Sequence, residues 1–306
     1  MTVESLKARL LSEIQGEVRF NEPLRRYTSY RIGGPADILV QPATEEDVVK
    51  TLKAAWEHQT PVYVMGSGSN LLISDEGVRG VVLRLGHWLG EVTFSGNVVR
   101  AQAGAALPKV AKMAADRGLA GLEWGGGIPG TVGGAVAMNA GAHGGEIRDV
   151  LLRAHLVSRD GTRLACSVEE MQYSYRRSGL IRETGHVVVG AEFQLRPEGV
   201  EAITRRMREY AARRRSTQPL GLPSSGSVFK NPPGDYAGRL VEAANLKGTR
   251  IGGAQISEIH GNFIVNRGDA TARDVKALID LVRSTVRDRF GIDLELEVEL
   301  VGWDGE

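Results

Sequence analysis

The chain lacks most features that mark a secreted or membrane-spanning protein. Among 306 residues there is a single cysteine, Cys166, so neither an internal disulfide nor a thiolate metal site can form. Cys166 lies in an apolar stretch, where we expect a buried structural thiol. No run approaches the roughly 18 apolar residues that span a bilayer, and the N-terminal stretch MTVESLKARLLSEI carries acids, unlike a signal peptide. These absences predict a cytoplasmic protein without membrane insertion and without a bound metal.

An excess of charge of one sign is also missing. The sequence holds 38 Lys and Arg against 37 Asp and Glu, and the formal net charge of +1 provides no overall field for nucleic acid or an anionic membrane. The basic cluster Arg213, Arg214 and Arg215 ends an expected helix, where cations are favoured anyway. We interpret it as a solvated or substrate-facing helix end, and we expect a monomer without a nucleic-acid partner.

The common nucleotide-binding motifs are absent or incomplete. No G-x-x-x-x-G-K-[ST] motif occurs, so P-loop chemistry is not supported. The letters from Gly125 to Gly130 match G-x-G-x-x-G, and Glu146 follows about 20 residues later, where that motif has a ribose-binding acid. We interpret the match as accidental, because the motif needs a strand directly before it and residues 131–146 supply no second strand.

Glycine, in contrast, is concentrated in the stretch GGGIPGTVGGAVAMNAGAHGG at 125–145. Nine of these 21 residues are glycine, and none is Lys, Arg, Asp or Glu. So many glycines cost entropy on folding and need a compensating ligand or packing reason. This glycine-rich run can hold an anion only through backbone N–H groups and a helix start. A mobile linker is the alternative, but apolar residues interrupt the run, unlike a flexible linker.

A second neutral loop, Gly66-Ser67-Gly68-Ser69-Asn70, follows the short apolar stretch PVYVM, which we expect to be a buried strand. Successive N–H groups, with hydroxyl and amide donors from Ser67, Ser69 and Asn70, suit an anion nest. Two uncharged glycine-containing loops some 60 residues apart favour one extended dinucleotide over two small ligands.

Hydrophobic periodicity indicates a mixture of helices and strands. Helices are expected at 4–14, after Thr44, at 107–117, 200–216, 236–245 and 271–290. Strands are expected at 31–42, 61–65, 71–75, 80–85, 91–94, 98–104, 152–158, 162–167, 186–195, 262–266 and 294–301. Asp160-Gly161 predicts a hairpin, and 262–301 reads as a compact β-α-β pattern.

The length suggests two domains, and a composition shift near Pro197 divides the chain into 1–197 and 198–306. The first part is expected to comprise two subdomains, roughly 1–80 and 81–197. Thr44 and Asp47 predict the start of a helix with Trp56 on its buried face.

Six stretches together resemble the UDP-N-acetylenolpyruvoylglucosamine reductases, flavoenzymes of bacterial peptidoglycan synthesis. They are TSYRIGG (28–34), MGSGSNLLI (65–73), GGGIPGTVGGAVAMNAGAHGGEI (125–147), YSYRRS (173–178), GSVFKNP (226–232) and LELEVELVG (294–302). The resemblance implies an α+β chain: a two-subdomain FAD-binding fold of the vanillyl-alcohol-oxidase type, followed by a small α/β substrate domain. The short link 179–185 is similar to the family's second type, which lacks an inserted loop with a substrate-capping tyrosine.

The resemblance also implies the chemistry. NADPH reduces non-covalently bound FAD, and hydride from the flavin then reduces UDP-N-acetylglucosamine-enolpyruvate to UDP-N-acetylmuramate. Arg176, Ser227 and Glu297 match the catalytic positions; Lys230, Asn231 and Arg214 would hold the nucleotide-sugar phosphates. The matched cofactor residues are Tyr30, Arg31, Gly33, Gly66, Ser67, Gly68, Ser69, Asn70, Gly125, Gly127, Ile128, Pro129, Thr131, Gly133, Gly134 and Asn139.

Other interpretations of these residues stay open at this point. Ser225 and Ser227 can instead satisfy backbone groups of a Pro/Gly loop, and Glu297 alternates with Glu295 and Glu299, as on a solvent-exposed strand face. His143 is expected in a turn rather than as a flavin tether.

Which of the three arginines contacts substrate, and whether His260 or Asn262 takes part, is undecided by the sequence. The alternative functions are a carbohydrate oxidase of the same fold and a non-catalytic FAD- or nucleotide-sugar-binding module.

Overall fold

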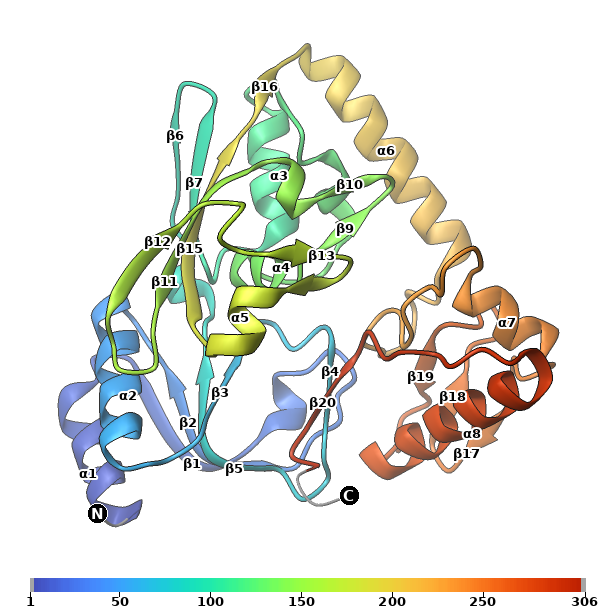
Figure 1. The fold of residues 1–306 in the computed structure, drawn as a ribbon, viewed down its shortest axis with the longest axis horizontal. Coiled ribbons are helices and arrows are strands. Elements are labelled where there is room, and N and C mark those ends of the chain that lie inside the picture. The colour runs from blue at the N-terminus through green and yellow to red at the C-terminus, as the bar shows by residue number, and fades with distance from the viewer. Residues whose placement is uncertain (1–2, 304–306) are drawn as a thin grey trace. The chain divides into compact units, whose positions relative to one another are not determined.

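The computed structural model describes residues 3–303 and divides the chain into two compact units (Figure 1). Unit 1 is built from the chain up to Phe20, Ile38–Ser67 and Gly80–Ala212. Unit 2 is built from Asn21–Asp37, Gly68–Arg79 and the chain from Arg213 onward. Each unit is therefore discontinuous in sequence, and two early segments belong with the C-terminal third of the chain.

Eight α-helices are assigned within the described residues: α1 (Val3–Glu13), α2 (Glu45–Glu57), α3 (Leu107–Ala115), α4 (Val132–Ala137), α5 (Gly179–Thr184), α6 (Val200–Thr217), α7 (Ala237–Ala243) and α8 (Ala272–Phe290). The 3-10 helices are η1 (Leu24–Arg26), η2 (His87–Leu89), η3 (Glu123–Gly127) and η4 (Ile147–Asp149). The Thr44 side chain accepts the amide of Asp47 at the start of α2, as the sequence predicts. Within residues 3–303, no helix has the length and apolar character needed to cross a membrane.

The two largest sheets have the strand orders β1-β2-β5-β3 and β12-β11-β15-β7-β6. Their strands are β1 (Glu17–Pro23), β2 (Pro35–Gln41), β3 (Val62–Met65), β5 (Val78–Arg84), β6 (Val92–Ser95), β7 (Val98–Gln102), β11 (Leu151–Val157), β12 (Arg163–Cys166) and β15 (Val187–Gln194). The predicted hairpin at Asp160-Gly161 is confirmed, because it joins β11 to its antiparallel neighbour β12.

The remaining strands form short pairs and one three-stranded sheet, β17-β18-β19. They are β4 (Leu71–Ile73), β8 (Leu119–Ala120), β9 (Gly141–Ala142), β10 (Gly145–Glu146), β13 (Tyr173–Ser174), β14 (Arg177–Ser178), β16 (Arg196–Pro197), β17 (Arg250–Ile251), β18 (Ala254–Ile256), β19 (Ile264–Asn266) and β20 (Glu299–Val301). β9 and β10 fall where no strand was expected, but each has only two residues.

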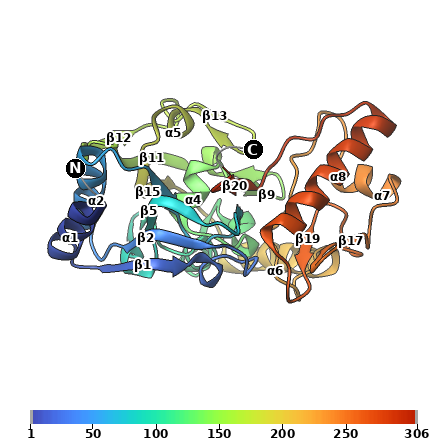
Figure 2. The ribbon, with the colours of Figure 1, turned by 90° about the horizontal axis from the view of Figure 1, so that it is seen from below.

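Unit 1 has two large apolar cores within the described residues. One joins α3 and α4 to the five-stranded sheet, with Phe193, Val136 and Leu107 fully buried in it. The other joins α1 and α2 to the four-stranded sheet through Leu6, Leu10 and Ile38 and their neighbours. The two helices lie side by side against that sheet (Figures 1 and 2). Burying these apolar faces positions the glycine-rich run, because α4 lies within it.

Unit 2 has a core of its own, formed by α7, α8 and the three-stranded sheet together with Tyr30, Ile32 and Leu72. The predicted apolar stripe of α8 is confirmed, since Val275, Leu278, Ile279, Val282 and Val286 are all buried. Its Thr271 capping box and its left-handed end at Gly291 delimit the helix as capping rules require.

The strands expected at 31–42 and 294–301 are among those that are shorter than expected, and the strand that ends the predicted β-α-β pattern does not pair with β19. β2 starts only at Pro35, because Arg31 and Gly33 take positive φ values of 57° and 140° and leave the extended conformation. The C-terminal strand is confined to 299–301 and pairs with β4 in parallel, not with β19. The alternating apolar pattern did not reveal which strand would be its neighbour.

Three burial expectations are also wrong. Trp56 leaves the buried face of α2 and is 59% exposed, since Thr51, Ala54 and Ala55 occupy the contact surface. β3 is mostly half-buried, with only Met65 fully buried. Cys166 is half-exposed rather than buried, because it ends β12 at the edge of its sheet.

Candidate functional site

The two neutral loops meet in unit 1, at Gly66 and Thr131. A β-carbon on Gly66 would lie 2.2 Å from Thr131 Oγ1, so only glycine permits this approach. Thr131 is buried and accepts the amide of Gly134, 3.5 Å away, as the N-cap of α4. The expectation that both loops serve one ligand therefore has a geometric basis within unit 1.

The start of α4 is not an open anion site. The amide of Val132 donates to the carbonyl of Ala105, and the amide of Gly133 donates to the carbonyl of Ala103, each at 2.8 Å. The glycine at 133 is required by packing, because its β-carbon would lie 2.9 Å from the Ala103 side chain. Two of the backbone N–H groups at the helix start that was expected to hold an anion are therefore already used by the protein.

Gly134 is different, because it is exposed in the middle of a buried helix. A β-carbon there would have Thr131 Oγ1, 3.7 Å away, as its nearest neighbour. Space beside this glycine is therefore open to a ligand and not filled by protein. The other predicted cofactor residues of the run range from exposed (Pro129) through half-buried (Gly127, Ile128) to buried (Gly125).

Asn139 is fully buried, so its side chain has no exposed atom for a cofactor. Its amide nitrogen donates to Glu146 Oε2 at 3.0 Å and to the carbonyl of Ser174 at 3.1 Å, while Oδ1 accepts the amide of Arg148 at 3.0 Å. Asn139, at a positive φ of 46°, thus ties the glycine-rich run to the β13–β14 hairpin.

That hairpin carries Arg176 at its tip. The hairpin is held by Tyr173, whose hydroxyl donates to the carbonyl of Val136 in α4 at 2.9 Å. Arg176 takes a left-handed φ of 56°, stacks over Tyr175, and donates from Nη2 to the carbonyl of Gly141 at 2.6 Å. Its neighbour Arg177 lies in β14. The structure therefore brings Arg176 to the glycine-rich run.

In unit 2, the predicted cofactor residues 30–33 form a rigid turn. Thr28 Oγ1 donates to the carbonyl of Ile32 at 2.8 Å, and the Arg31 amide donates to the carbonyl of Thr28. Tyr30 is buried, whereas Arg31 is exposed. Gly33 approaches Ile73 so closely that a β-carbon would lie 3.1 Å away.

The Asn70 amide, predicted as an anion donor, already has a partner within the protein. Its Nδ2 donates to the backbone carbonyl of Glu297 at 2.8 Å, and its own carbonyl accepts the amide of Glu299 at 3.0 Å. Gly68, at a φ of 63°, accepts the amide of Ser29. Ser67 is exposed and Ser69 half-buried. Asn70 thus positions the segment that contains Glu297.

Ser227 and Glu297 are brought together across the chain. The amide of Glu297 donates at 2.9 Å to the carbonyl of Val228, the residue after Ser227. Glu297 is half-buried in a bend, whereas Glu295 and Glu299 are exposed, so the expectation of three equivalent strand glutamates is wrong. Neither Ser225 nor Ser227 donates to a backbone group of residues 3–303, which also contradicts their interpretation as loop-satisfying serines.

The three predicted substrate-binding residues differ in how they are engaged. Lys230 Nζ lies 3.3 Å from Glu295 Oε2, an exposed ion pair, and Asn231 accepts the first amide of α7 from Ala237 at 3.1 Å. Arg214 is half-buried without an ion pair among the described residues, and burial lowers its pKa. Among the three consecutive arginines, only Arg214 is withdrawn from solvent in this way.

Asn262 and His260 have internal partners. The buried Asn262 side chain bonds in both directions to the backbone of Phe229, at 2.9 and 2.7 Å. His260 accepts the amide of Asn262 on Nδ1, and burial lowers the pKa of its imidazole. His143 lies in a turn, as predicted, and stacks on Tyr210 of α6 with ring centroids 4.2 Å apart.

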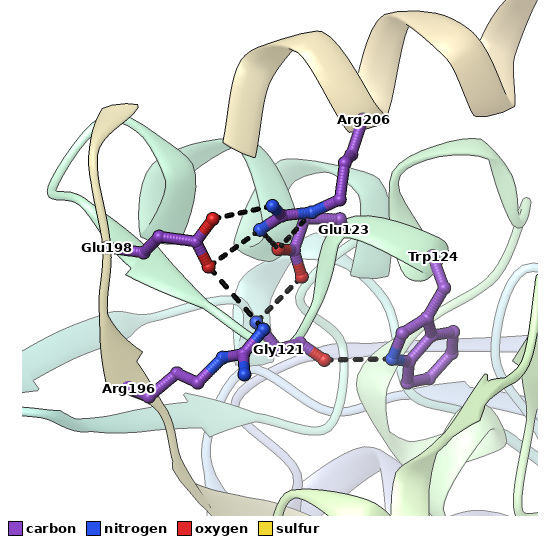
Figure 3. A network of polar contacts seen from close by, with 6 residues as sticks. All are labelled: Gly121, Glu123, Trp124, Arg196, Glu198 and Arg206. Carbon is purple, nitrogen blue, oxygen red and sulfur yellow. Dashed lines mark hydrogen bonds and ion pairs between the residues drawn. The ribbon is translucent and has the colours of Figure 1, made fainter. Parts of the chain in front are cut away.

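The sequence interpretation missed an ion-pair network next to the glycine-rich run (Figure 3). Arg206 of α6 donates to Glu123 at 3.2 Å and to Glu198 at 2.5 Å, and Glu123 also accepts the amide of Gly121 at 2.7 Å. Burial acts to raise the pKa of Glu123, but the bonds from Arg206 and Gly121 lower it to below its usual value. A signal was present in the basic character of α6, but nothing in the sequence pairs it with Glu123.

Comparisons with known proteins agree with this geometry. A family model for the C-terminal domain of UDP-N-acetylenolpyruvoylglucosamine reductase matches residues 218–301, and a model for an FAD binding domain matches residues 36–167. UDP-N-acetylenolpyruvoylglucosamine reductase 2 of Symbiobacterium thermophilum is 52% identical over 287 residues, covering 94% of this chain and 93% of the relative.

Solved structures extend the likeness to the fold. The UDP-N-acetylenolpyruvylglucosamine reductase (MurB) of Thermus caldophilus superposes with a TM-score of 0.80 at 38% identity, over 94% of this chain and 99% of the other. A Phl p 4 variant, a glucose oxidase, reaches a TM-score of 0.50 at 15% identity over 63% of this chain and 44% of the other, and so shares the fold alone. The predicted α+β fold with a vanillyl-alcohol-oxidase-type FAD-binding part is confirmed. The chain belongs to the UDP-N-acetylenolpyruvoylglucosamine reductase family.

Proposed function

We propose that this chain reduces the enolpyruvyl group of UDP-N-acetylglucosamine-enolpyruvate to UDP-N-acetylmuramate with the residues assigned below. As a family member, it is an FAD-containing oxidoreductase of peptidoglycan precursor synthesis that takes its electrons from NADPH. When bound, FAD passes hydride from NADPH to the substrate double bond.

FAD fits the residues present. The loops around Gly66 and Thr131 are neutral and meet, and the open space beside Gly134 would be filled by any side chain. We assign the cofactor a non-covalent attachment, because His143 stacks on Tyr210 and Cys166 lies in β12, outside the sequence of both neutral loops. The remaining cofactor assignments are Arg31, Gly33, Ser67, Gly68, Ser69, Gly125, Gly127, Ile128, Pro129 and Gly133. Tyr30 and Asn139, which are buried, and Asn70, which is bonded to Glu297, act by positioning their neighbours.

Arg176 stabilises the charge that forms on the substrate. A hydride added to one alkene carbon leaves negative charge on the other carbon and on its carboxylate. The guanidinium of Arg176 has several N–H donors in a fixed plane, and its bond to the Gly141 carbonyl fixes the orientation in which a substrate carboxylate would meet it. Preorganisation by Gly141 and the Tyr175 ring supports this role.

Ser227 donates the proton that completes the reaction, and Glu297 assists it. The observation that carries this assignment is that the amide of Glu297 is bonded to the carbonyl next to Ser227, although 70 positions separate the two residues. A half-buried hydroxyl without a bond to residues 3–303 is available for a ligand. A donor within reach of a strongly basic carbon does not need a low pKa in water.

Arg214, Lys230 and Asn231 hold the nucleotide-sugar phosphates. The half-buried and unpaired cation of Arg214 supports this most directly, because an anionic ligand would offset its burial. We assign residues 1–197 to FAD binding, as subdomains of roughly 1–80 and 81–197, and residues 198–306 to substrate binding. The enzyme is a cytoplasmic monomer of the family's second type.

Steady-state turnover with two substrate sets tests the proposal. NADPH should be consumed only when the enolpyruvyl substrate is supplied, and an authentic UDP-N-acetylmuramate should appear as product. Turnover of a free sugar with O₂ would instead identify a carbohydrate oxidase. FAD binding without turnover of either set would identify a binding module.

A further inference from the structure

The segment that carries Ser227, here named the serine loop (223–228), is clamped at its two ends. At one end the amide of Asn266 donates to the carbonyl of Pro223 at 2.9 Å; at the other the amide of Val228 donates to the carbonyl of Asn262 at 2.9 Å. Between these clamps, no backbone hydrogen bond to any residue of 3–303 involves positions 224–227.

Gly226 adds freedom in the middle of this loop. It has a left-handed φ of 78°, and a β-carbon there would meet no atom within 4 Å. Packing therefore does not hold Gly226, and the backbone on either side of it can turn. A reacting hydroxyl in such a loop needs another attachment, because small displacements of a reacting group are expensive in rate.

One attachment within the described chain is available, at Ser225. Its hydroxyl is buried, with the residue 2% exposed, and has no hydrogen-bond partner among the described residues. The phenol oxygen of Tyr30 is also buried without a hydrogen-bond partner among the described residues, and the residue is 1% exposed. Asn266 holds the two segments beside each other, because it bonds both the Tyr30 carbonyl and the Pro223 carbonyl. Burial raises the pKa of the Tyr30 phenol, and the neighbouring Ser225 hydroxyl offsets only part of that rise.

Tyr30 is itself fixed independently of Ser225. Its carbonyl accepts Nδ2 of Asn266 at 2.9 Å, the same residue whose backbone amide clamps Pro223. Asn266 is 4% exposed, and its Oδ1 accepts the amides of Gly268 and Ala270. One buried asparagine thus holds the Tyr30 turn and the start of the serine loop beside each other.

We propose that Tyr30 and Ser225 form a buried hydroxyl pair that positions Ser227 for proton donation. This inference rests on the proposed role of Ser227. A hydroxyl can rotate to donate or accept, so two adjacent buried hydroxyls without another partner can bond to each other. Ser225 faces inward to Tyr30, Gly226 turns the backbone, and Ser227 is then presented at a defined place. Tyr30 and Ser225 are positioning residues that do not exchange a proton with substrate.

Removing the two hydroxyls one at a time and then together distinguishes a role in positioning Ser227 from a role in stability alone. Tyr30→Phe or Ser225→Ala alone leaves one buried hydroxyl unsatisfied, so each should lower the melting temperature of the holoenzyme by about 2–4 °C. The double variant has neither hydroxyl, so no buried hydroxyl is left without a partner, and its melting temperature should return close to wild type. Reoxidation of the reduced flavin by the enolpyruvyl substrate should stay slow by roughly tenfold in all three variants, while reduction by NADPH stays normal.

Matched controls lie close by. Tyr27→Phe removes a phenol bonded to Glu22 in the same segment, and Ser224→Ala removes the preceding serine. Neither should slow reoxidation. In a Ser227→Ala background, adding Tyr30→Phe and Ser225→Ala should cause no further loss, because the pair acts through Ser227.

The outcomes are distinguishable. A native reoxidation rate in the double variant, or unchanged melting temperatures in both single variants, overturns the positioning pair while leaving Ser227 as the donor. A further loss in the Ser227→Ala background also overturns it. A native rate in Ser227→Ala itself overturns the proposed donor, whatever the pair variants do.

Discussion

In unit 1 the glycine-rich run (125–145) is attached along its length, whereas in unit 2 the serine loop (223–228) is attached at its ends and at Ser225. The run is bonded through the amides of Val132 and Gly133 and through the buried side chain of Asn139. The serine loop has two backbone clamps and one buried hydroxyl contact.

The difference follows from what each segment has to do. A surface that binds a large ligand through uncharged groups benefits from rigidity. A segment that is already ordered loses little further conformational entropy on binding. A proton donor that acts on one carbon must be oriented toward that carbon, and a few contacts are enough to orient it. Glycine has opposite uses in the two places: close approach at Gly66 and Gly133, and freedom to turn at Gly226. Changes to the serine loop should therefore affect rate, and changes to the run should affect cofactor binding.

The largest effect is expected for Ser227→Ala. Reoxidation of reduced flavin by the enolpyruvyl substrate should fall by a factor of roughly 10² or more, the scale of a lost general acid. FAD content, melting temperature and reduction by NADPH should stay near wild type, and Ser227→Cys should recover part of the rate. Stopped-flow measurement of the two half-reactions checks this. A near-native rate in Ser227→Ala would assign the proton to Glu297 or to water.

The second-largest effect is expected for Gly134→Leu, which should weaken FAD binding. The added side chain enters space that the protein leaves open, and an overpacked ligand contact costs about 2 kcal/mol, or about thirtyfold in affinity. Apoprotein stability should hold, because the nearest protein atom to the new β-carbon is 3.7 Å away. Titration of apoprotein with FAD measures this. Arg148→Gln, which removes a nearby exposed charge paired with Glu146, is the control and should change affinity little. Equal losses of FAD affinity in the two variants would contradict the assignment of FAD to the two neutral loops.

Arg176→Lys should slow reoxidation by about tenfold, the equivalent of one charge-assisted hydrogen bond. A lysine offers a single point charge, which cannot keep the Gly141 carbonyl and also face a carboxylate in two places. Reduction by NADPH should be much less affected, and Arg177→Lys is the matched control on the same hairpin. Equal losses in both half-reactions would mean that Arg176 holds the flavin or the structure.

The smallest effect is expected for Glu123→Gln, about 0.5–1 kcal/mol of stability at neutral pH, because glutamine keeps an acceptor oxygen and loses only the charge in a partly exposed pair. The pKa of Glu123 is lowered in the folded state, so its contribution is present above the ordinary value near 4.5 and is lost as pH falls through the folded pKa. The variant should therefore show a flatter loss of stability below about pH 4.5 in urea unfolding. Glu198→Gln, at the more exposed partner of Arg206, should change less. Parallel pH profiles for wild type and Glu123→Gln would contradict this role.

Local patterns predicted the parts of the fold that depend on local chemistry. The Thr44 cap, the apolar stripe of α8 and the Asp160-Gly161 hairpin were predictable because neighbouring residues determine them. Long-range pairing was not. The last strand pairs with β4, from position 71, and no periodicity specifies a neighbour more than 200 positions away.

The candidate site divides in the same way. The sequence by itself determined the family motifs, the neutral character of both loops and the identities of Arg176, Ser227 and Glu297, because these depend only on residue type and order. Tertiary structure alone decided which polar groups are free to meet a ligand. The amides of Val132 and Gly133 and the side chains of Asn70 and Asn139 are engaged by residues distant in sequence or in other elements, whereas Gly134 is left open. A donor's availability depends on every neighbour that folding brings to it, and burial obliges each such group to find a partner.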